Sequence, residues 1–301
     1  MTLGVTSPAA RVKRHGQRGA SLFVWPLIAI MALTTLLPVG YAIVLSFFDW
    51  NWGSRFNFIG FGNYATVMQD ADFWWSVIRT LSFAVVAVSV EVAIGLGLAI
   101  LINRMNRGIG WIRTALMLPM MVSGIVVALV WKLMLDPTLG VIPRALSEIG
   151  LGTVDLLGNQ STALLTVAGL DAWWQTGFVF IVLSASLAAL PTEPFEAAAV
   201  DGAGRWQTFR HVTMPMLLPA ILMITAIRLV DCLKVFALVY GTTEGGPLNA
   251  TEVTQILVYR TAFKEFAMSQ SMTMMLVYSF VIAAILIAGY LVFRKVNSRD
   301  N

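Results

Sequence analysis

The sequence predicts an all-α integral membrane protein with six transmembrane helices, both chain ends in the cytoplasm, and a short cytoplasmic helix between helices four and five. Hydrophobic residues make up 58% of the 301 residues and charged residues only 12%. Apolar stretches of about 20 residues can cross a hydrocarbon core of about 30 Å as helices, which satisfy their own backbone groups in lipid. Six such stretches are predicted as spans: Leu22–Phe48, Ser76–Ile102, Arg113–Leu135, Thr162–Leu190, Leu217–Tyr240 and Met268–Phe293.

These spans occupy most of the chain, so no soluble domain is expected. We predict an N-terminal tail at 1–21, a six-helix domain at 22–293 that includes a loop at 191–216, and a C-terminal tail at 294–301. The first apolar run is too long for a signal peptide and lacks a small-residue cleavage site, so we expect an uncleaved helix.

The distribution of Lys and Arg predicts the orientation. Most of the basic residues outside the spans fall in the N-terminal tail, in the loops after the second and fourth spans, and in the C-terminal tail. Positive charge is retained on the cytoplasmic side, so both ends are expected inside. Because the charge is split among four short segments, nucleic-acid binding is not expected.

The outer loops are predicted to lie at the membrane surface. Four tryptophans are placed where an amphipathic ring suits the outer headgroup region: Trp50, Trp52, Trp74 and Trp75. The pattern over Phe61–Val77 predicts a short helix lying on that face.

The polar segment between Pro191 and Pro219 is predicted to form a short helix outside the membrane. Glu196 suits the first turn of a helix, and Ala197–Ala199 are strong helix formers. Gly202 is placed to end the helix, and its neighbour Asp201 adds a second carboxylate that could pair with arginines of a partner protein. An ordinary amphipathic loop is the alternative on composition alone.

The spacing within this segment points to a family. Three residues separate Glu196-Ala197-Ala198 from Gly202, and nine residues separate Gly202 from Val212-Thr-Met-Pro215. This spacing resembles the signature loop of ATP-binding-cassette importer permeases, with Val and Met where the family usually has Ile and Leu. In that family the loop forms a coupling helix that docks into the ATPase subunit. The resemblance implies this coupling role for Glu196, Ala197, Ala198, Asp201, Gly202 and Pro215.

Other stretches resemble the carbohydrate-uptake branch of that family, of the maltose and glycerol-3-phosphate permease type: Tyr41–Trp50, Phe58–Tyr64, Arg113–Pro119 and Gly245–Pro247. The chain departs from the pattern at Phe266–Ser271, where Gly-Tyr and small residues are usual. The resemblance places Gly245, Gly246 and Pro247 in an outer loop that faces a solute-binding protein.

The resemblance also implies partners and a location. It implies a second homologous permease subunit, two copies of an ATP-binding subunit and an extracytoplasmic solute-binding protein, in the cytoplasmic membrane of a bacterium or archaeon. The implied mechanism is alternating access between two states that ATP switches.

ATP hydrolysis is expected in the partner subunits. The phosphate-binding motif G-x-x-x-x-G-K-[ST] requires a lysine after a glycine, and no lysine in this chain follows one. No nucleophile–base constellation and no metal-ligand spacing are found. We therefore expect a transport subunit that is no enzyme and binds no cofactor, with ATP and Mg held by its partners.

Ionisable residues inside predicted spans are candidates for the substrate pathway, because buried charge in a membrane is costly. The fifth span holds Arg228, Asp231 and Lys234 at intervals of three residues, so Asp231 could pair with either cation, and the second span holds Glu91. Two interpretations stay open, namely ion pairs that fix helix packing and direct contact with substrate.

The fourth span carries Asp171, Trp173, Trp174 and Gln175 near its outer part. Aromatic faces with carboxylate and amide acceptors suit a sugar or polyol, although an interfacial aromatic belt is an equal alternative. A phosphorylated solute such as glycerol-3-phosphate would need clustered cations, whereas Asp231 partly balances Arg228 and Lys234.

Two other classes of membrane protein are alternatives. An ion-gradient-driven secondary transporter would use Asp231 or Glu91 as a proton carrier, and such folds show broken helices and inverted repeats, neither of which is evident in the sequence. A passive membrane scaffold has no use for the buried charges.

Overall fold

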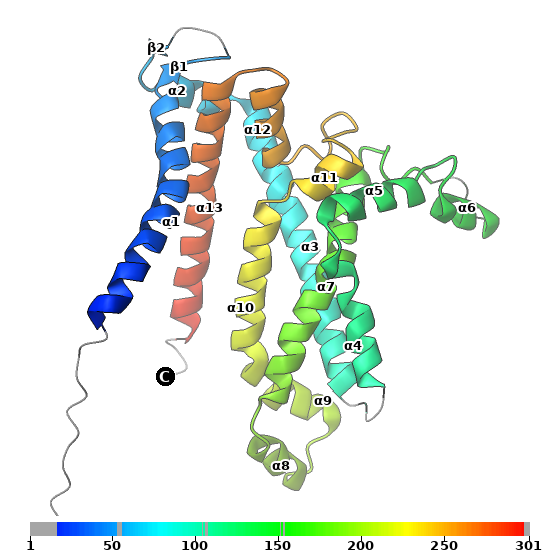
Figure 1. The fold of residues 1–301 in the computed structure, drawn as a ribbon. Coiled ribbons are helices and arrows are strands. Elements are labelled where there is room, and N and C mark those ends of the chain that lie inside the picture. Colours follow the sequence, from blue (N-terminus) through cyan, green and yellow to red (C-terminus); the bar gives the residue numbers. More distant parts are fainter. Residues whose placement is uncertain are drawn as a thin grey trace, which may run out of the picture.

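The computed structural model describes residues 17–52, 56–103, 105, 108–150, 152 and 154–297, with side chains described from residue 24 to residue 291. Five helices are long and apolar enough to cross a membrane, or six if one bent pair counts as a single span. The long helices are α1 (Gln17–Leu45), α3 (Ala71–Asn103), α7 (Ala163–Ala188), α10 (Met214–Leu233) and α13 (Met268–Asn297). Figure 1 shows them running roughly side by side.

Shorter elements connect these helices. They are β1 (Phe48–Asp49), β2 (Asn57–Phe58), α2 (Gly62–Gln69), α4 (Ile109–Met117), η1 (Pro119–Met121), α5 (Gly124–Met134), α6 (Val141–Glu148), α8 (Glu193–Val200), α9 (Arg205–Thr208), η2 (Phe209–Thr213), α11 (Ala237–Thr242) and α12 (Thr254–Phe263). The two strands pair antiparallel, with Phe48 opposite Phe58. In Figure 1, α8, the first residues of α1 and the last residues of α13 lie at one end of the molecule, and α6, α11 and α12 lie at the other. We call these the α8 end and the α12 end.

The first and last long helices reach into the segments predicted as tails. Helix α1 begins at Gln17, inside the predicted tail 1–21, and α13 runs to Asn297, inside the predicted tail 294–301. The remaining tail residues lie outside the described part of the chain. The predicted first span also ends early, since α1 stops at Leu45 and the chain turns into β1.

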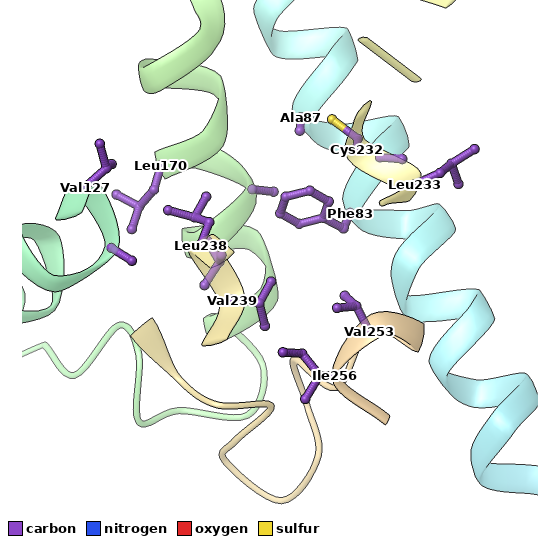
Figure 2. Close-up of a cluster of buried hydrophobic side chains, with 14 of the residues drawn as sticks. Phe83, Ala87, Val127, Leu170, Cys232, Leu233, Leu238, Val239, Val253 and Ile256 are labelled. Atoms are coloured by element: carbon purple, nitrogen blue, oxygen red, sulfur yellow. The ribbon is translucent and has the colours of Figure 1, made fainter. Parts of the chain in front are cut away.

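The core is built on α3, α7 and α10. Small residues allow close contact between α3 and α7, since a Cβ added to Gly95 would lie 2.7 Å from Val179 Cγ1. Buried apolar side chains from α3, α5, α7, α10, α11 and α12 gather around Phe83 (Figure 2). By contrast, most described side chains of α1 are exposed, so this helix contributes little to the core of the isolated chain.

The predicted surface helix over Phe61–Val77 is present only in its first half. The structure has α2, and α3 then begins at Ala71, five residues before the predicted second span. The break falls at Asp70, whose Oδ1 accepts the backbone N–H groups of Asp72 and Phe73. This is the action of a helix N-cap, so Asp70 starts α3 and places Trp74 and Trp75 in its first turns.

The prediction of one continuous third span over Arg113–Leu135 is wrong, and so is the expectation of no broken helix. The segments Ile109–Met121 and Gly124–Met134 meet at 95°. Pro119 and the extended backbone of Val122 interrupt the helix, and the indole N–H of Trp174 donates to the Val122 carbonyl at 3.2 Å. The Trp174 ring lies against Gly124, where an added Cβ would be 2.8 Å from it.

The predicted fifth span, Leu217–Tyr240, is displaced. Helix α10 ends at Leu233, and Tyr240 belongs to the separate helix α11. At the other end, the helical path continues back through η2, a π-helical turn, to Arg205. Apolar residues flank the break at Lys234–Phe236 on both sides, so the mean hydropathy of the segment predicted one span despite the charges of Asp231 and Lys234.

We predict that Gly177→Ala destabilises the fold. A Cβ at Gly177 of α7 would lie 2.1 Å from the Leu116 carbonyl oxygen of α4, so α4 must move. The expected cost is about 1–3 kcal/mol. Thermal unfolding of the purified protein in detergent measures it.

The matched control is Gly169→Ala in the same helix, where an added Cβ meets nothing within 4 Å. This variant should be unchanged or slightly more stable, because alanine favours a helix over glycine. Equal stability of the two variants would contradict the close approach of α4 to α7.

Candidate transport site

Arg228 of α10 is the centre of a buried charge cluster. Its Nε lies 2.6 Å from Glu91 Oε2 and its Nη2 lies 3.1 Å from Glu91 Oε1, so the two side chains meet as a fork. Nη2 also lies 2.8 Å from Asp171 Oδ2, and Nη1 lies 3.3 Å from Asp231 Oδ2. The Arg228, Glu91 and Asp171 side chains are 5%, 0% and 6% exposed, whereas that of Asp231 is 50% exposed.

This cluster joins three helices, because Glu91 belongs to α3 and Asp171 to α7. The predicted pairing of Arg228 with Asp231 is confirmed as an ion pair. The two shorter ion pairs of Arg228, to Glu91 and Asp171, were not predicted from the sequence. Burying these charges is tolerable only because they are paired and hydrogen-bonded to one another.

The cluster does not fit a metal ion. Possible ligand atoms of Glu91, Asp171 and Cys232 lie within 4.8 Å of one another. However, the Arg228 guanidinium already donates to the oxygens of both carboxylates and lies 3.5 Å from the Cys232 sulfur. A cation at this place would have to displace a buried guanidinium.

A cavity of about 450 Å³ adjoins the cluster. Its polar lining comes from Asp171, Trp174, Gln175, Arg228, Asp231 and Lys234. Its apolar lining comes from Cys232 and from residues 235–238, at the break after α10 and in the first turn of α11. The break in the predicted fifth span therefore helps to form a cavity with a few convergent polar groups, as in sites for small molecules.

Two predicted pathway residues lie outside this lining. Glu91 is fully buried behind Arg228. Trp173 packs edge-on against Trp131, with ring centroids 5.2 Å apart, and is 49% exposed. Lys234 lines the cavity, and within the described part of the chain it makes no ion pair.

An aromatic cluster at the α12 end was missed from the sequence. Phe236, which lines the cavity, stacks on Tyr240 with ring centroids 5.2 Å apart. Tyr259 of α12 contacts both rings at 5.4 and 5.3 Å, and Phe263 contacts Tyr259 at 5.1 Å. In the sequence, the available signal was the spacing of four residues between Phe236 and Tyr240 and between Tyr259 and Phe263, which places each pair on one helical face. Of this cluster, Phe236 lines the cavity, and the other three rings pack behind it.

The loop at Gly245, Gly246 and Pro247 is held by hydrogen bonds at the α12 end. The Thr251 hydroxyl donates to the Gly246 carbonyl at 2.7 Å, and the Thr251 N–H donates to Gly245. The next residue, Glu252, is buried and pairs with Arg260. Burial raises the pKa of Glu252, while the positive charge of Arg260 opposes that rise.

The short helix predicted around Glu196 is present as α8, at the α8 end of the molecule (Figure 1). Glu193 and Glu196 lie in its first turn, and Asp201 caps its C-terminus. Gly202 follows with φ +74°, a left-handed conformation that glycine adopts without strain. Glu196, Ala197, Asp201 and Gly202 are exposed, and Ala198 is half-buried.

Two exposed apolar side chains, one at the end of α8 and one in α9, were missed. Val200 is 87% exposed and Trp206, in α9, is 69% exposed. A tryptophan that follows the Glu-Ala-Ala stretch closely in an otherwise polar loop was the available signal. Exposed apolar side chains in a polar segment are typical of a docking surface.

Residues 91–299 match the model of a protein family described as the binding-protein-dependent transport system inner membrane component. The chain belongs to this family. The resemblance to ATP-binding-cassette importer permeases predicted from the Glu196–Pro215 segment is thereby confirmed. This permease is a multi-pass protein of an inner-membrane family whose members are transport components rather than enzymes.

Relatives along most of the permease support the same assignment. A probable ABC transporter permease protein of Sinorhizobium fredii is 34% identical, over 95% of this chain and 94% of its own. The trehalose/maltose transport system permease protein MalF of Thermococcus litoralis is 32% identical over 83% and 85%. The sn-glycerol-3-phosphate transport system permease protein UgpA of Yersinia pestis is 31% identical over 83% and 85%.

A solved structure supports the fold. The permease resembles a chain of a bacterial ABC transporter involved in the import of the acidic polysaccharide alginate. The TM-score is 0.78 at 24% identity, covering 92% of this chain and 96% of that one. At this identity the likeness concerns the fold alone.

Proposed function

We propose that this permease is the transmembrane subunit of an ATP-driven importer that moves a sugar or polyol by alternating access. Its partners are a second homologous permease subunit, two ATP-binding subunits and an extracytoplasmic solute-binding protein, in the cytoplasmic membrane of a bacterium or archaeon. The chain has six spans, with the bent pair α4–α5 as the third, and both ends in the cytoplasm.

One observation carries the proposal. The exposed helix α8, with the family's Glu-Ala-Ala pattern, stands at one end of a bundle whose polar cavity lies beside the break in α10. The chain has no phosphate-binding motif, so in this proposal ATP is hydrolysed by a partner protein that contacts α8. Glu196, Ala197, Ala198, Asp201, Gly202 and Pro215 form the coupling surface, and Val200 and Trp206 add apolar contacts to it.

The cavity is the substrate pathway in this proposal. Asp231 and Lys234 are exposed close to the end of an apolar helix, where contact with lipid would be costly. Water, solute or a second permease must therefore cover them. Several relatives are named for trehalose, maltose or starch-derived sugars, which supports a sugar or polyol, and one for sn-glycerol-3-phosphate, which keeps that solute as the alternative.

A second candidate is an ion-gradient-driven secondary transporter. The broken helix α4–α5 and the buried carboxylates are features that such a protein uses. Against it, both buried carboxylates are bonded to Arg228, and the coupling helix would have no purpose. Ion-driven solute flux through this chain alone in liposomes would favour the second candidate.

The proposal is tested by co-purification of the ATP-binding subunit with Val200→Asp. A charge at this apolar contact should reduce retention of the ATP-binding subunit at least about tenfold, as at interface hot spots. Leu248→Asp is the matched control, because Leu248 is 82% exposed at the α12 end. Full retention by Val200→Asp would contradict docking at α8.

A further inference from the structure

Four of the five N–H groups of Arg228 already donate to carboxylates. A guanidinium has five N–H groups. Nε donates to Glu91, Nη2 donates to both Glu91 and Asp171, and Nη1 donates to Asp231. The remaining N–H is on Nη1, next to the half-exposed Asp231 carboxylate, so an anion bonded there would lie beside a negative charge. Bonds to Nε or Nη2 would have to replace those to buried carboxylates, which is costly.

The charge around the cavity has no positive surplus. Glu91, Asp171 and Asp231 carry three formal negative charges, whereas Arg228 and Lys234 carry two formal positive charges. Protonation of one carboxylate would bring the sum to zero. Lys234 is the cation of this set that makes no ion pair in the described part of the chain, but the half-exposed Asp231 carboxylate lines the same cavity, so an entering anion meets both charges and no positive surplus.

The free hydrogen-bonding capacity suits hydroxyl groups. The Asp231 carboxylate is half exposed and only 3.3 Å from Arg228, so it can accept further donors. Gln175 supplies an amide to the same cavity, and Trp174 and Phe236 supply aromatic surface. Sugar hydroxyls donate to carboxylates, and the apolar faces of sugar rings suit aromatic walls.

We propose that this cavity selects uncharged saccharides or polyols over anionic ones, with Asp231 as the hydroxyl acceptor that determines the selection. This inference rests on the proposed function and deepens it. It rejects uronates, aldonates and sugar phosphates as solutes for this chain, although a related permease is named for sn-glycerol-3-phosphate.

The test is equilibrium binding to the purified complex without the solute-binding protein, so that only the permease selects. Two matched probe pairs differ mainly by one anionic group: maltitol with maltobionate, and glycerol with glycerol-3-phosphate. We expect the neutral member of at least one pair to bind at least tenfold more tightly than its anionic partner. Equal or tighter binding of the anionic member overturns the inference.

Other outcomes are also decisive. If no probe binds while the complex retains its ATP-binding subunit and hydrolyses ATP, the inference fails and the proposed function stands. If no ATP-binding subunit associates, the proposed function itself fails.

Asp231→Lys tests the assigned residue. It changes the formal charge of the set formed by Glu91, Asp171, residue 231, Arg228 and Lys234 from negative to positive. The preference for the neutral probe should therefore fall at least tenfold. Asp231→Asn, which only removes the negative charge, should lower that preference less. Glu148→Lys, an exposed charge reversal on α6 away from the cavity, should leave the preference unchanged. If Asp231→Lys does not fold, Asp231→Asn decides, and an unchanged preference there overturns the role of Asp231.

Discussion

Arg228→Met should destabilise the protein more than any other single substitution considered. It removes the partner of Glu91, which is 0% exposed, and of Asp171, while filling a similar volume. Removing one partner of a buried ion pair costs about 3–5 kcal/mol, because an uncompensated charge stays buried. Thermal unfolding of the purified protein and its yield in membranes measure the loss.

Three further variants separate lost charge from lost packing. The triple variant Glu91→Gln, Asp171→Asn, Arg228→Met should recover much of the stability, because it leaves no buried charge. Arg228→Lys should be intermediate, since an ammonium cannot reproduce the fork to Glu91. Lys234→Met, at an exposed cation six residues away, should cost little. An Arg228→Met protein as stable as Lys234→Met would contradict the structural importance of the cluster.

Glu196→Lys should abolish solute uptake while the fold is retained. The side chain is exposed on α8, so its replacement disturbs no core contact. A positive charge there repels partner arginines that the carboxylate would pair with, so hydrolysis by the ATP-binding subunits should be uncoupled from transport. Uptake into proteoliposomes should fall at least about tenfold, as when a central charged contact is lost.

Glu193→Lys is the matched control, because it also reverses a charge in the first turn of α8 and has the same effect on the helix dipole. A smaller loss for Glu193→Lys would show that docking of Glu196, rather than helix stability, carries the effect. A Glu196→Lys complex with full uptake would contradict the coupling surface.

The helix α8 was predictable because its signals are local. Glu196 in the first turn, the alanines after it and Gly202 at the end each act within a few residues, and the structure begins and ends the helix accordingly. The spacing to Pro215 then gave the family without any tertiary information.

The breaks at Val122–Ser123 and Lys234–Phe236 were not predictable from hydropathy, because apolar residues lie on both sides and outweigh the single polar or charged residue in each. The first is fixed from another helix, through the indole of Trp174. Such a tertiary contact overrides the local preference for a continuous helix.

The charge cluster was only partly predictable for the same reason. The Arg228–Asp231 pair spans three residues on one helix and follows from helical spacing. The shorter contacts from Arg228 reach Glu91 across 137 positions and Asp171 across 57. Sequence spacing carries no information on which distant helices become neighbours, so these partners required the fold.

The most direct test of the importer assignment is reconstitution. The permease, expressed with the products of its neighbouring genes, is placed in liposomes, and ATP hydrolysis is measured with and without the solute-binding protein across a panel of sugars. We expect hydrolysis to be stimulated by the solute-binding protein loaded with one neutral sugar or polyol. If no ATPase activity associates with the permease under any of these conditions, the assignment of α8 as a coupling helix is contradicted.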